Sequence, residues 1–271
     1  MEPFWLRMKY NWGGLLLIFC LGSKPIQLQV NPHVKLNCDL GEGAGSEAAV
    51  IPFIDQANIA CGFHAGSPEL MRETLLLAKA HGVSIGAHPG YADREGFGRK
   101  SLPCNSDEIV ELVRQQISAL GELAISEGII IDYVKPHGAL YHDMLNNTEV
   151  RSAIYLAVSQ SPAPLAMMIQ ATSEIESHRA EASQAGLEVW AEAFADRRYD
   201  NVGRLVPRQE AGAVLDRSQM LAQVQQLVTE GSVTTDAGNK LGVSADTLCV
   251  HGDHAEGVEG IQEIRKLLSN G

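Results

Sequence analysis

Residues 34–43 read VKLNCDLGEG, a short apolar run that ends in two acids, Asp39 and Glu42, set among glycines. The same arrangement, an apolar run followed at once by titratable residues and glycine, recurs along the chain. Runs of this length bounded by turn residues are typical of buried parallel strands. The predicted strands are Val34–Leu40, Ala57–Phe63, Ser84–His88, Ile131–Lys135, Leu165–Gln170, Leu187–Phe194 and Thr247–His251.

Segments with helical patterning separate these strands. Ser67-Pro68-Glu69 places a cap residue, a proline and an acid in the order that begins a helix, and Gly82 ends it. Asn105 begins a second helix that ends near Gly128. Further helices are predicted at Thr148–Ser159, Ser173–Ala185, Asp216–Glu230 and Glu256–Leu268, and loops at Ala195–Gly212 and Gly231–Ala245. About seven strand-plus-helix units predict the α/β class with a parallel sheet inside the helices, and the polar strand ends favour a closed or nearly closed (β/α) barrel.

Length and composition set the outer limits. The chain has 271 residues, 45% of them hydrophobic, which suits one barrel domain over residues 34–271. A net charge of −12 argues against nucleic acid and anionic membranes as partners. The five cysteines are odd in number and widely spaced, which favours reduced thiols in a cytoplasmic protein over disulfides or a structural zinc site.

Residues 1–33 differ from the rest of the chain. Arg7 and Lys9 precede an apolar run from Trp12 to Gly22, which has the layout of a signal peptide but lacks a clean cleavage site. The run is also short for a membrane span. An upstream extension, disordered or assigned from a misplaced start, is the preferred interpretation.

Titratable residues follow nearly every predicted strand. The C-terminal strand ends of a β/α barrel share one face, so these residues are expected to meet there in one cleft. The predicted catalytic set is Asp39, Glu42, His64, His88, Lys135 and His137. Each residue alone has a structural alternative: a lone histidine is more often a hydrogen-bonded structural residue, Asp39 and Glu42 suit a helix start, and Asp253 suits a helix cap. Burying so many ionisable groups costs several kcal/mol each unless they are paired or surround a ligand, so together they favour a functional site.

Basic residues gather in the predicted loops. Arginines there suit a carboxylate or phosphoryl group, although solvated loop charges are an equal alternative for Arg94 and Arg198. The predicted substrate-binding set is Arg94, Arg99, Asp196, Arg197, Arg208, His251 and Asp253. No phosphate-binding P-loop, dinucleotide fingerprint or G-x-S-x-G elbow occurs, so ATP binding by this chain alone has no motif behind it.

Several blocks together resemble the signature of the LamB/YcsF lactam-utilisation family, whose members are subunits of bacterial 5-oxoprolinase. The blocks are Asn37–Gly43, Ala57–Gly66, Gly86–Pro89 with Asp93–Arg99, Val134–Tyr141, Glu192–Arg197, Leu205–Arg208 and Cys249–Asp253. The resemblance runs from about Val34 to the C-terminus and leaves residues 1–33 uncovered. Ser67 stands where the family often has an acid, and Cys38 where alanine is usual.

The resemblance implies a modified β/α barrel related to polysaccharide deacetylases. It implies ATP-dependent conversion of 5-oxo-L-proline, a small anionic lactam, to L-glutamate in a complex with two other subunits. A cytosolic supply of ATP favours the cytoplasm as its location. Phosphorylation of the amide oxygen would explain the use of ATP, with Asp39 or Glu42 as general base and Lys135 as charge stabiliser.

Two alternatives stay open at this point. One is a metal-dependent, deacetylase-like hydrolase in which Asp39, His64 and His88 hold a divalent metal. The other is a non-catalytic subunit that only delivers the lactam to its partners. For a catalytic role, alanine at His64 or Lys135 is expected to abolish turnover and leave the fold intact.

Overall fold

The computed structural model describes residues 34–252 and 255–269. The extension predicted at residues 1–33 and the predicted site residue Asp253 lie outside the described residues. None of the helices in the described ranges is long and apolar enough to cross a membrane.

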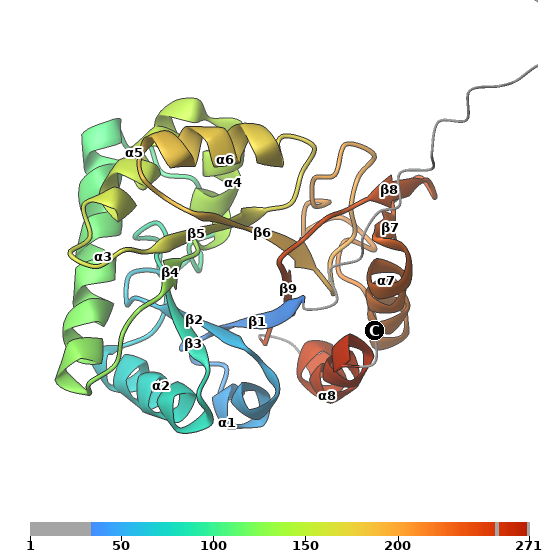
Figure 1. Ribbon diagram of the computed structural model, residues 1–271, viewed down its shortest axis with the longest axis horizontal. Helices are drawn as coiled ribbons and strands as arrows, with labels where there is room; N and C mark the ends of the chain where they lie inside the picture. The colour runs from blue at the N-terminus through green and yellow to red at the C-terminus, as the bar shows by residue number, and fades with distance from the viewer. Residues whose placement is uncertain (1–33, 253–254, 270–271) are drawn as a thin grey trace, which may run out of the picture.

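Seven parallel strands close into a barrel, with β9 paired to β6 on one side and to β1 on the other. Figure 1 looks into this ring of strands and shows the helices around its outside. The strands are β1 (Lys35–Leu40), β2 (Gln56–Ala60), β3 (Ser84–His88), β4 (Tyr133–Val134), β5 (Ala166–Gln170), β6 (Val189–Phe194) and β9 (Thr247–Cys249). The predicted α/β class and seven-stranded parallel barrel are confirmed.

Two helices begin at the capping residues that predict them, Ser67 and Asn105. Ser67 Oγ accepts a hydrogen bond from Leu70 N, and Gly82 ends the helix at φ +68°. The Asn105 and Glu108 side chains form a capping box. The helices are α1 (Glu47–Val50), the 3₁₀ turn η1 (Ile51–Phe53), α2 (Pro68–His81), α3 (Ser106–Ser126), α4 (Gly138–Asn146), α5 (Thr148–Ser159), α6 (Ile175–Gln184), α7 (Arg217–Glu230) and α8 (Ala255–Ser269).

Several elements were not expected from the sequence, among them the short helices α1 and η1. Helix α4 begins directly after His137 with no side-chain cap, so no start signal marks it. The prediction of a loop at Gly231–Ala245 is wrong in part, because β7 (Ser232–Thr234) and β8 (Lys240–Gly242) form an antiparallel hairpin there. Strands of three residues are too short to show a periodic pattern. The loop predicted at Ala195–Gly212 contains no helix or strand.

Alternate side chains along the strands point to two different buried regions, one apolar and one polar. One set of residues, such as Leu36, Cys38 and Leu40 of β1, packs with the helices in the main apolar core. The other set includes Asn37 and Asp39 and joins buried polar groups of the other strands by hydrogen bonds and ion pairs. A separate small apolar cluster contains Tyr133, Ala166 and Met168, with Trp190 packed against it. Branched apolar residues usually fill a β/α barrel, so a polar interior that leads to the strand ends is the main departure of this fold.

Candidate active site

A cleft of about 330 Å³ opens where the C-terminal ends of the strands meet. Small-ligand sites commonly start at about this size. The predicted site residues that line it are Asp39, His88, Arg99, Lys135, His137, Arg197, Arg208 and His251. Residues more than 200 positions apart in the sequence, such as Asp39 and His251, therefore face one space.

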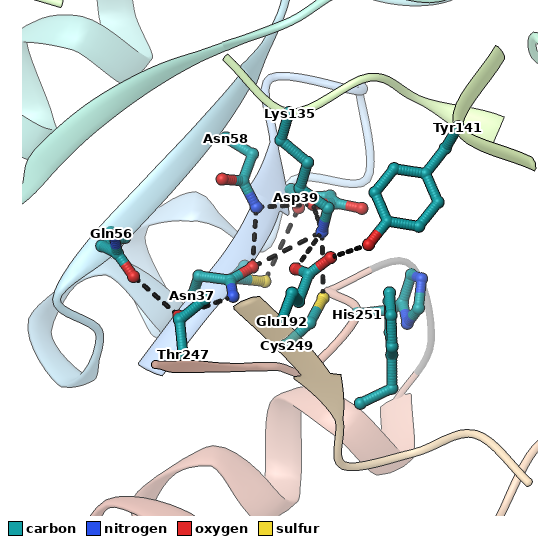
Figure 2. Close-up of polar contacts among 12 residues, drawn as sticks. Asn37, Asp39, Gln56, Asn58, Lys135, Tyr141, Glu192, Thr247, Cys249 and His251 are labelled. Carbon is teal, nitrogen blue, oxygen red and sulfur yellow. Dashed lines mark hydrogen bonds and ion pairs between the residues drawn. The ribbon is translucent and has the colours of Figure 1, made fainter. Parts of the chain in front are cut away.

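The lysine cluster, defined as Lys135, Asp39, Glu192 and Cys249, lies at the base of this cleft. Lys135 Nζ is 2.8 Å from Asp39 Oδ1, 2.8 Å from Glu192 Oε1 and 3.2 Å from Cys249 Sγ. Figure 2 shows the ammonium group between the two carboxylates. Burial alone would lower the pKa of Lys135, but electrostatic interactions with Asp39, Cys249 and Glu192 together outweigh it and raise that pKa well above its usual value. Lys135 is therefore a permanent cation in the site.

Hydrogen bonds from other side chains of the barrel interior orient the Asp39 carboxylate. Asn58 Nδ2 donates to Asp39 Oδ1 at 2.7 Å and to Asn37 Oδ1 at 2.8 Å, and the Tyr133 hydroxyl donates to Asn58 Oδ1 at 2.6 Å. Burial would raise the pKa of Asp39, but the charges on His88 and Lys135 hold it well below its usual value. Asp39 is accordingly an ionised, oriented group and a weak proton acceptor.

A hydrogen bond also orients the carboxylate of Glu192, the second acid beside Lys135. The Tyr141 hydroxyl donates to Glu192 Oε2 at 2.8 Å, and the glutamate side chain is fully buried. The Tyr141 ring comes from α4, the helix that follows His137. Helix α4 therefore contributes to the site although the sequence gives no signal for its start.

The histidine cluster, defined as Glu42, His64, His88 and His137, lies beside the lysine cluster. Glu42 Oε1 is 3.2 Å from His137 Nδ1, 3.5 Å from His64 Nε2 and 3.7 Å from His88 Nε2. The rings of His64 and His137 stack with centroids 3.9 Å apart. His88 Nε2 also lies 3.3 Å from Asp39 Oδ2, which joins the two clusters.

Burial and neighbouring charges shift the pKa values of this cluster in opposite directions. Burial lowers the pKa of His64 to about 4, because the nearby Glu42 only partly compensates. Burial lowers the pKa of His137 as well. For His88 the burial effect has the same sign, but the carboxylates of Asp39 and Glu42 together outweigh it and raise the pKa. Burial would raise the pKa of Glu42, but the adjacent imidazole groups of His137 and His64 hold it far below its usual value.

Close backbone approach makes room for the histidines. Gly98 has φ +65°, and a Cβ there would lie 2.8 Å from His64 Cβ and 2.9 Å from His137 Cδ2. Gly138 has φ +54°, and its Cβ would lie 2.6 Å from the Gly98 carbonyl oxygen. Only glycine fits at either place without displacing the loop that covers the cluster.

A third group lies next to the lysine cluster, since a ring nitrogen of His251 is within 4.8 Å of ligand atoms of Asp39 and Cys249. His251 Nδ1 is 2.9 and 3.0 Å from the two carboxylate oxygens of Asp196, and its ring stacks on Phe194. An ionised carboxylate accepts the Nδ1 proton, so Nε2 of a neutral His251 carries a lone pair. An imidazole oriented by an aspartate is the usual arrangement of an acid–base catalyst.

The predicted arginines separate into different roles. Arg197 is buried and donates to the Val206 carbonyl at 2.6 Å, and burial together with the charge of Arg208 lowers its pKa to about 10. Arg99 and Arg208 line the cleft. Arg94 does not line it, since it donates to the carbonyls of Gly62 and Gly66, both at 2.7 Å, and joins two loops.

One known family covers the whole barrel. A model of the LamB/YcsF family matches residues 34–271. The chain belongs to the LamB/YcsF family.

Relatives of this LamB/YcsF protein cover most of its length. A Chromohalobacter salexigens protein, named as the A subunit of 5-oxoprolinase, is 46% identical over 86% of this chain and 96% of its own length. One of Vibrio parahaemolyticus with the same name is 46% identical over 88% of this chain and 97% of its own. The crystal structure of a lactam utilization protein from Thermus thermophilus is 37% identical, covers 88% of this chain and 96% of its own, and superposes with a TM-score of 0.79. The relation to deacetylases implied by the resemblance stays a prediction, since a Streptomyces lividans family 4 carbohydrate esterase superposes with a TM-score of 0.43 at 12% identity.

The groups that could hold a metal ion in this chain differ from the set expected from the sequence. Asp39, His64 and His88 were predicted, whereas the ligand atoms that lie within 4.8 Å of one another belong to Glu42, His64, His88 and His137. A second such group contains Asp39, Cys249 and His251. Asp39 is directed to the lysine cluster because β1 presents it toward Lys135 at the end of β4.

Several residues of the LamB/YcsF site were missing from the predicted set. They are Glu192, Tyr141, Cys249, Asn37 and Asn58. A signal for three of them exists in the sequence, because Glu192, Asn37 and Asn58 are polar residues inside apolar strands, at positions that alternate with the core residues. Tyr141 and Cys249 give no such signal, since either is an ordinary core residue.

Proposed function

We propose that this chain is a catalytic subunit of 5-oxoprolinase, which hydrolyses 5-oxo-L-proline to L-glutamate together with ATP. The names of its relatives support the reaction. The observation that carries the proposal is the cleft itself, which Arg99 and Arg208 line together with Lys135, Asp39 and imidazole groups. Arginine suits the carboxylate of the lactam, and the other polar lining groups suit its amide.

The chemistry accounts for the co-substrate. The lactam amide is stabilised by resonance, so direct attack by water is slow. Transfer of the ATP γ-phosphoryl group to the amide oxygen makes the ring carbon electrophilic and releases ADP. Water then adds to that carbon and the C–N bond breaks, so the nitrogen leaves as the amine and the carbon becomes the carbonyl of an acyl phosphate. A second water hydrolyses this acyl phosphate to L-glutamate and phosphate.

Three groups of this chain fit separate parts of that sequence. The Lys135 ammonium stabilises negative charge that develops on oxygen in the cleft. His251, oriented by Asp196, takes and returns the proton of the attacking water. Asp39 forms an ion pair with Lys135 and holds it in place. Asp39 does not act as the base, because its low pKa makes it a poor proton acceptor. ATP and two further subunits complete the proposed enzyme, and the supply of ATP puts it in the cytoplasm.

The test is ATP-dependent glutamate formation by the complex reconstituted from this chain and its partner subunits. Arg208→Gln is expected to lower kcat/KM for 5-oxo-L-proline by about 10- to 100-fold, mostly through KM, because a charge-assisted hydrogen bond contributes about 1.5–3 kcal/mol. The matched control is Arg114→Gln, an exposed arginine of α3 that pairs with Glu111. Absence of glutamate from the wild-type complex, or equal KM in the two variants, would refute the proposal.

A further inference from the structure

The four side chains of the histidine cluster contain an electrostatic conflict. His88 Nδ1 is 2.7 Å from the Lys135 carbonyl oxygen, and His137 Nε2 is 2.8 Å from the Phe97 carbonyl oxygen. A carbonyl only accepts hydrogen bonds, so both of these ring nitrogens carry the proton. In the neutral rings, His88 Nε2 and His137 Nδ1 are then both lone pairs, and they lie 3.0 Å apart.

A carboxylate adds to this conflict. Glu42 Oε1 lies 3.2 Å from His137 Nδ1 and 3.7 Å from His88 Nε2. Within the described residues, the ion-pair partners of Glu42 are the three histidines of the cluster. Three electron-rich atoms therefore converge on one point that requires a positive species.

The surroundings of His64 decide whether a metal ion or a proton fits this point better. Its side chain is completely buried, and in residues 34–252 and 255–269 neither ring nitrogen has a hydrogen-bond partner. One proton bridges two acceptors at most and would leave His64 without a partner. An ion bound by all four side chains satisfies His64 Nε2, which lies 3.5 Å from Glu42 Oε1.

We infer that Glu42, His64, His88 and His137 form a binding site for one divalent transition metal of the zinc type. Four ligands at about 2.05 Å from a tetrahedral ion lie about 3.4 Å from one another, and four of the six separations between the ligand atoms are 3.0, 3.2, 3.5 and 3.7 Å. Imidazole favours zinc-type ions, whereas Mg²⁺ and Ca²⁺ prefer oxygen ligands. The backbone carbonyls that accept from His88 and His137 are the outer partners that orient metal-bound imidazoles.

The charges of the surroundings fit such an ion. Glu42 neutralises one positive charge, and Asp39 Oδ2, 3.3 Å from His88 Nε2, faces the other. The second group of possible ligands, Asp39, Cys249 and His251, differs because the Lys135 ammonium already lies 2.8 Å from Asp39 and 3.2 Å from Cys249 Sγ. The inference concerns binding of the ion and does not depend on the proposed reaction.

The test uses the purified full chain, stripped with a chelator, with no lactam, ATP or partner present. Co²⁺ titration is expected to give one ion per chain with the intense visible absorption of tetrahedral Co²⁺, displaced by Zn²⁺. His64→Ala is expected to weaken binding by about 100-fold or more, since loss of an outer partner alone costs about 10- to 100-fold. His81→Ala, at the exposed end of α2, is the matched control and is expected to bind as the wild type does.

Failure of the wild-type chain to bind stoichiometric Co²⁺ or Zn²⁺ would overturn the inference, as would equal affinity in His64→Ala and wild type. The wild-type titration needs no variant, so a folding defect in His64→Ala leaves the inference testable. Loss of the metal site in these experiments would leave the proposed 5-oxoprolinase activity standing, because glutamate formation is measured separately.

Discussion

The lysine cluster and the histidine cluster are neighbours that handle buried negative charge in opposite ways. In the lysine cluster, Asp39 and Glu192 share the ammonium group of Lys135. In the histidine cluster, Glu42 is surrounded by imidazoles, and the pKa of His64 is lowered to about 4. One cluster contains its own cation, and the other offers lone pairs to a cation from outside.

The difference shows what burial demands of a charged site. A buried carboxylate costs several kcal/mol unless a positive partner lies nearby. A lysine supplies that partner permanently and fixes the geometry of the cleft. Histidines leave the charge balance open to an added ion or proton, which suits a group that takes part in binding or chemistry.

Loss of the built-in cation should have the largest effect. Lys135→Met keeps the volume of the side chain but leaves Asp39 and Glu192 as buried carboxylates without a cation. We expect the free energy of unfolding to fall by about 3–5 kcal/mol, measured by chemical denaturation of the chain. The expectation from sequence was that removal of Lys135 leaves the fold intact, and this measurement tests it.

Two further variants make that prediction specific. Lys266→Met, on the exposed side of α8, should change the free energy of unfolding by less than about 0.5 kcal/mol. Glu192→Gln should destabilise the wild-type chain but stabilise the Lys135→Met chain, because it removes a charge that no longer has a partner. Destabilisation in both backgrounds would show that Glu192 is not held through Lys135.

The histidine cluster should make the free energy of unfolding depend on pH between about 4 and about 6.5, a range in which the lysine cluster keeps its charges. An unfolded histidine has a pKa of about 6.5, whereas the pKa of buried His64 is about 4. Between these values the unfolded metal-free chain takes up a proton that the folded chain refuses, so stability falls as the pH decreases from 6.5 to 4. The contribution of His64 over this window is about 3 kcal/mol.

Denaturation of the metal-free chain at several pH values measures this contribution. His64→Asn should flatten the acid side of the stability profile, and the same substitution at exposed His81 should leave the slope unchanged. Parallel profiles for wild type and His64→Asn would mean that His64 is as easily protonated in the folded chain as in the unfolded one.

The smallest effect is expected at Cys249. Burial raises the pKa of its thiol well above the usual value, so the group is neutral and a poor metal ligand. Since two carboxylates already neutralise Lys135, Cys249→Ser should change the free energy of unfolding by about 1 kcal/mol or less. The Co²⁺ spectrum should be identical in wild type and Cys249→Ser, and a band that depends on the thiol would place the metal in the lysine cluster instead.

The strand ends were predictable because their signals are local. An apolar run that stops at glycine and a titratable residue identifies the end of a buried strand, as at Asp39, His88 and His137. Helix caps such as Ser67 and Asn105 act within one turn and were equally readable. Helix α4 and the β7–β8 hairpin lack such signals, since neither has a capping side chain or a long periodic pattern.

The sequence by itself determined the barrel, the family and the face on which the polar residues gather, because period and capping are properties of neighbouring residues. Only the tertiary structure decided that Asp39 pairs with Lys135 and Glu192, and that Glu42 goes to the histidines. Those pairings depend on which strands meet when the barrel closes and how their ends are staggered. Burial then sets the charges, because desolvation acts on a side chain through every element packed around it.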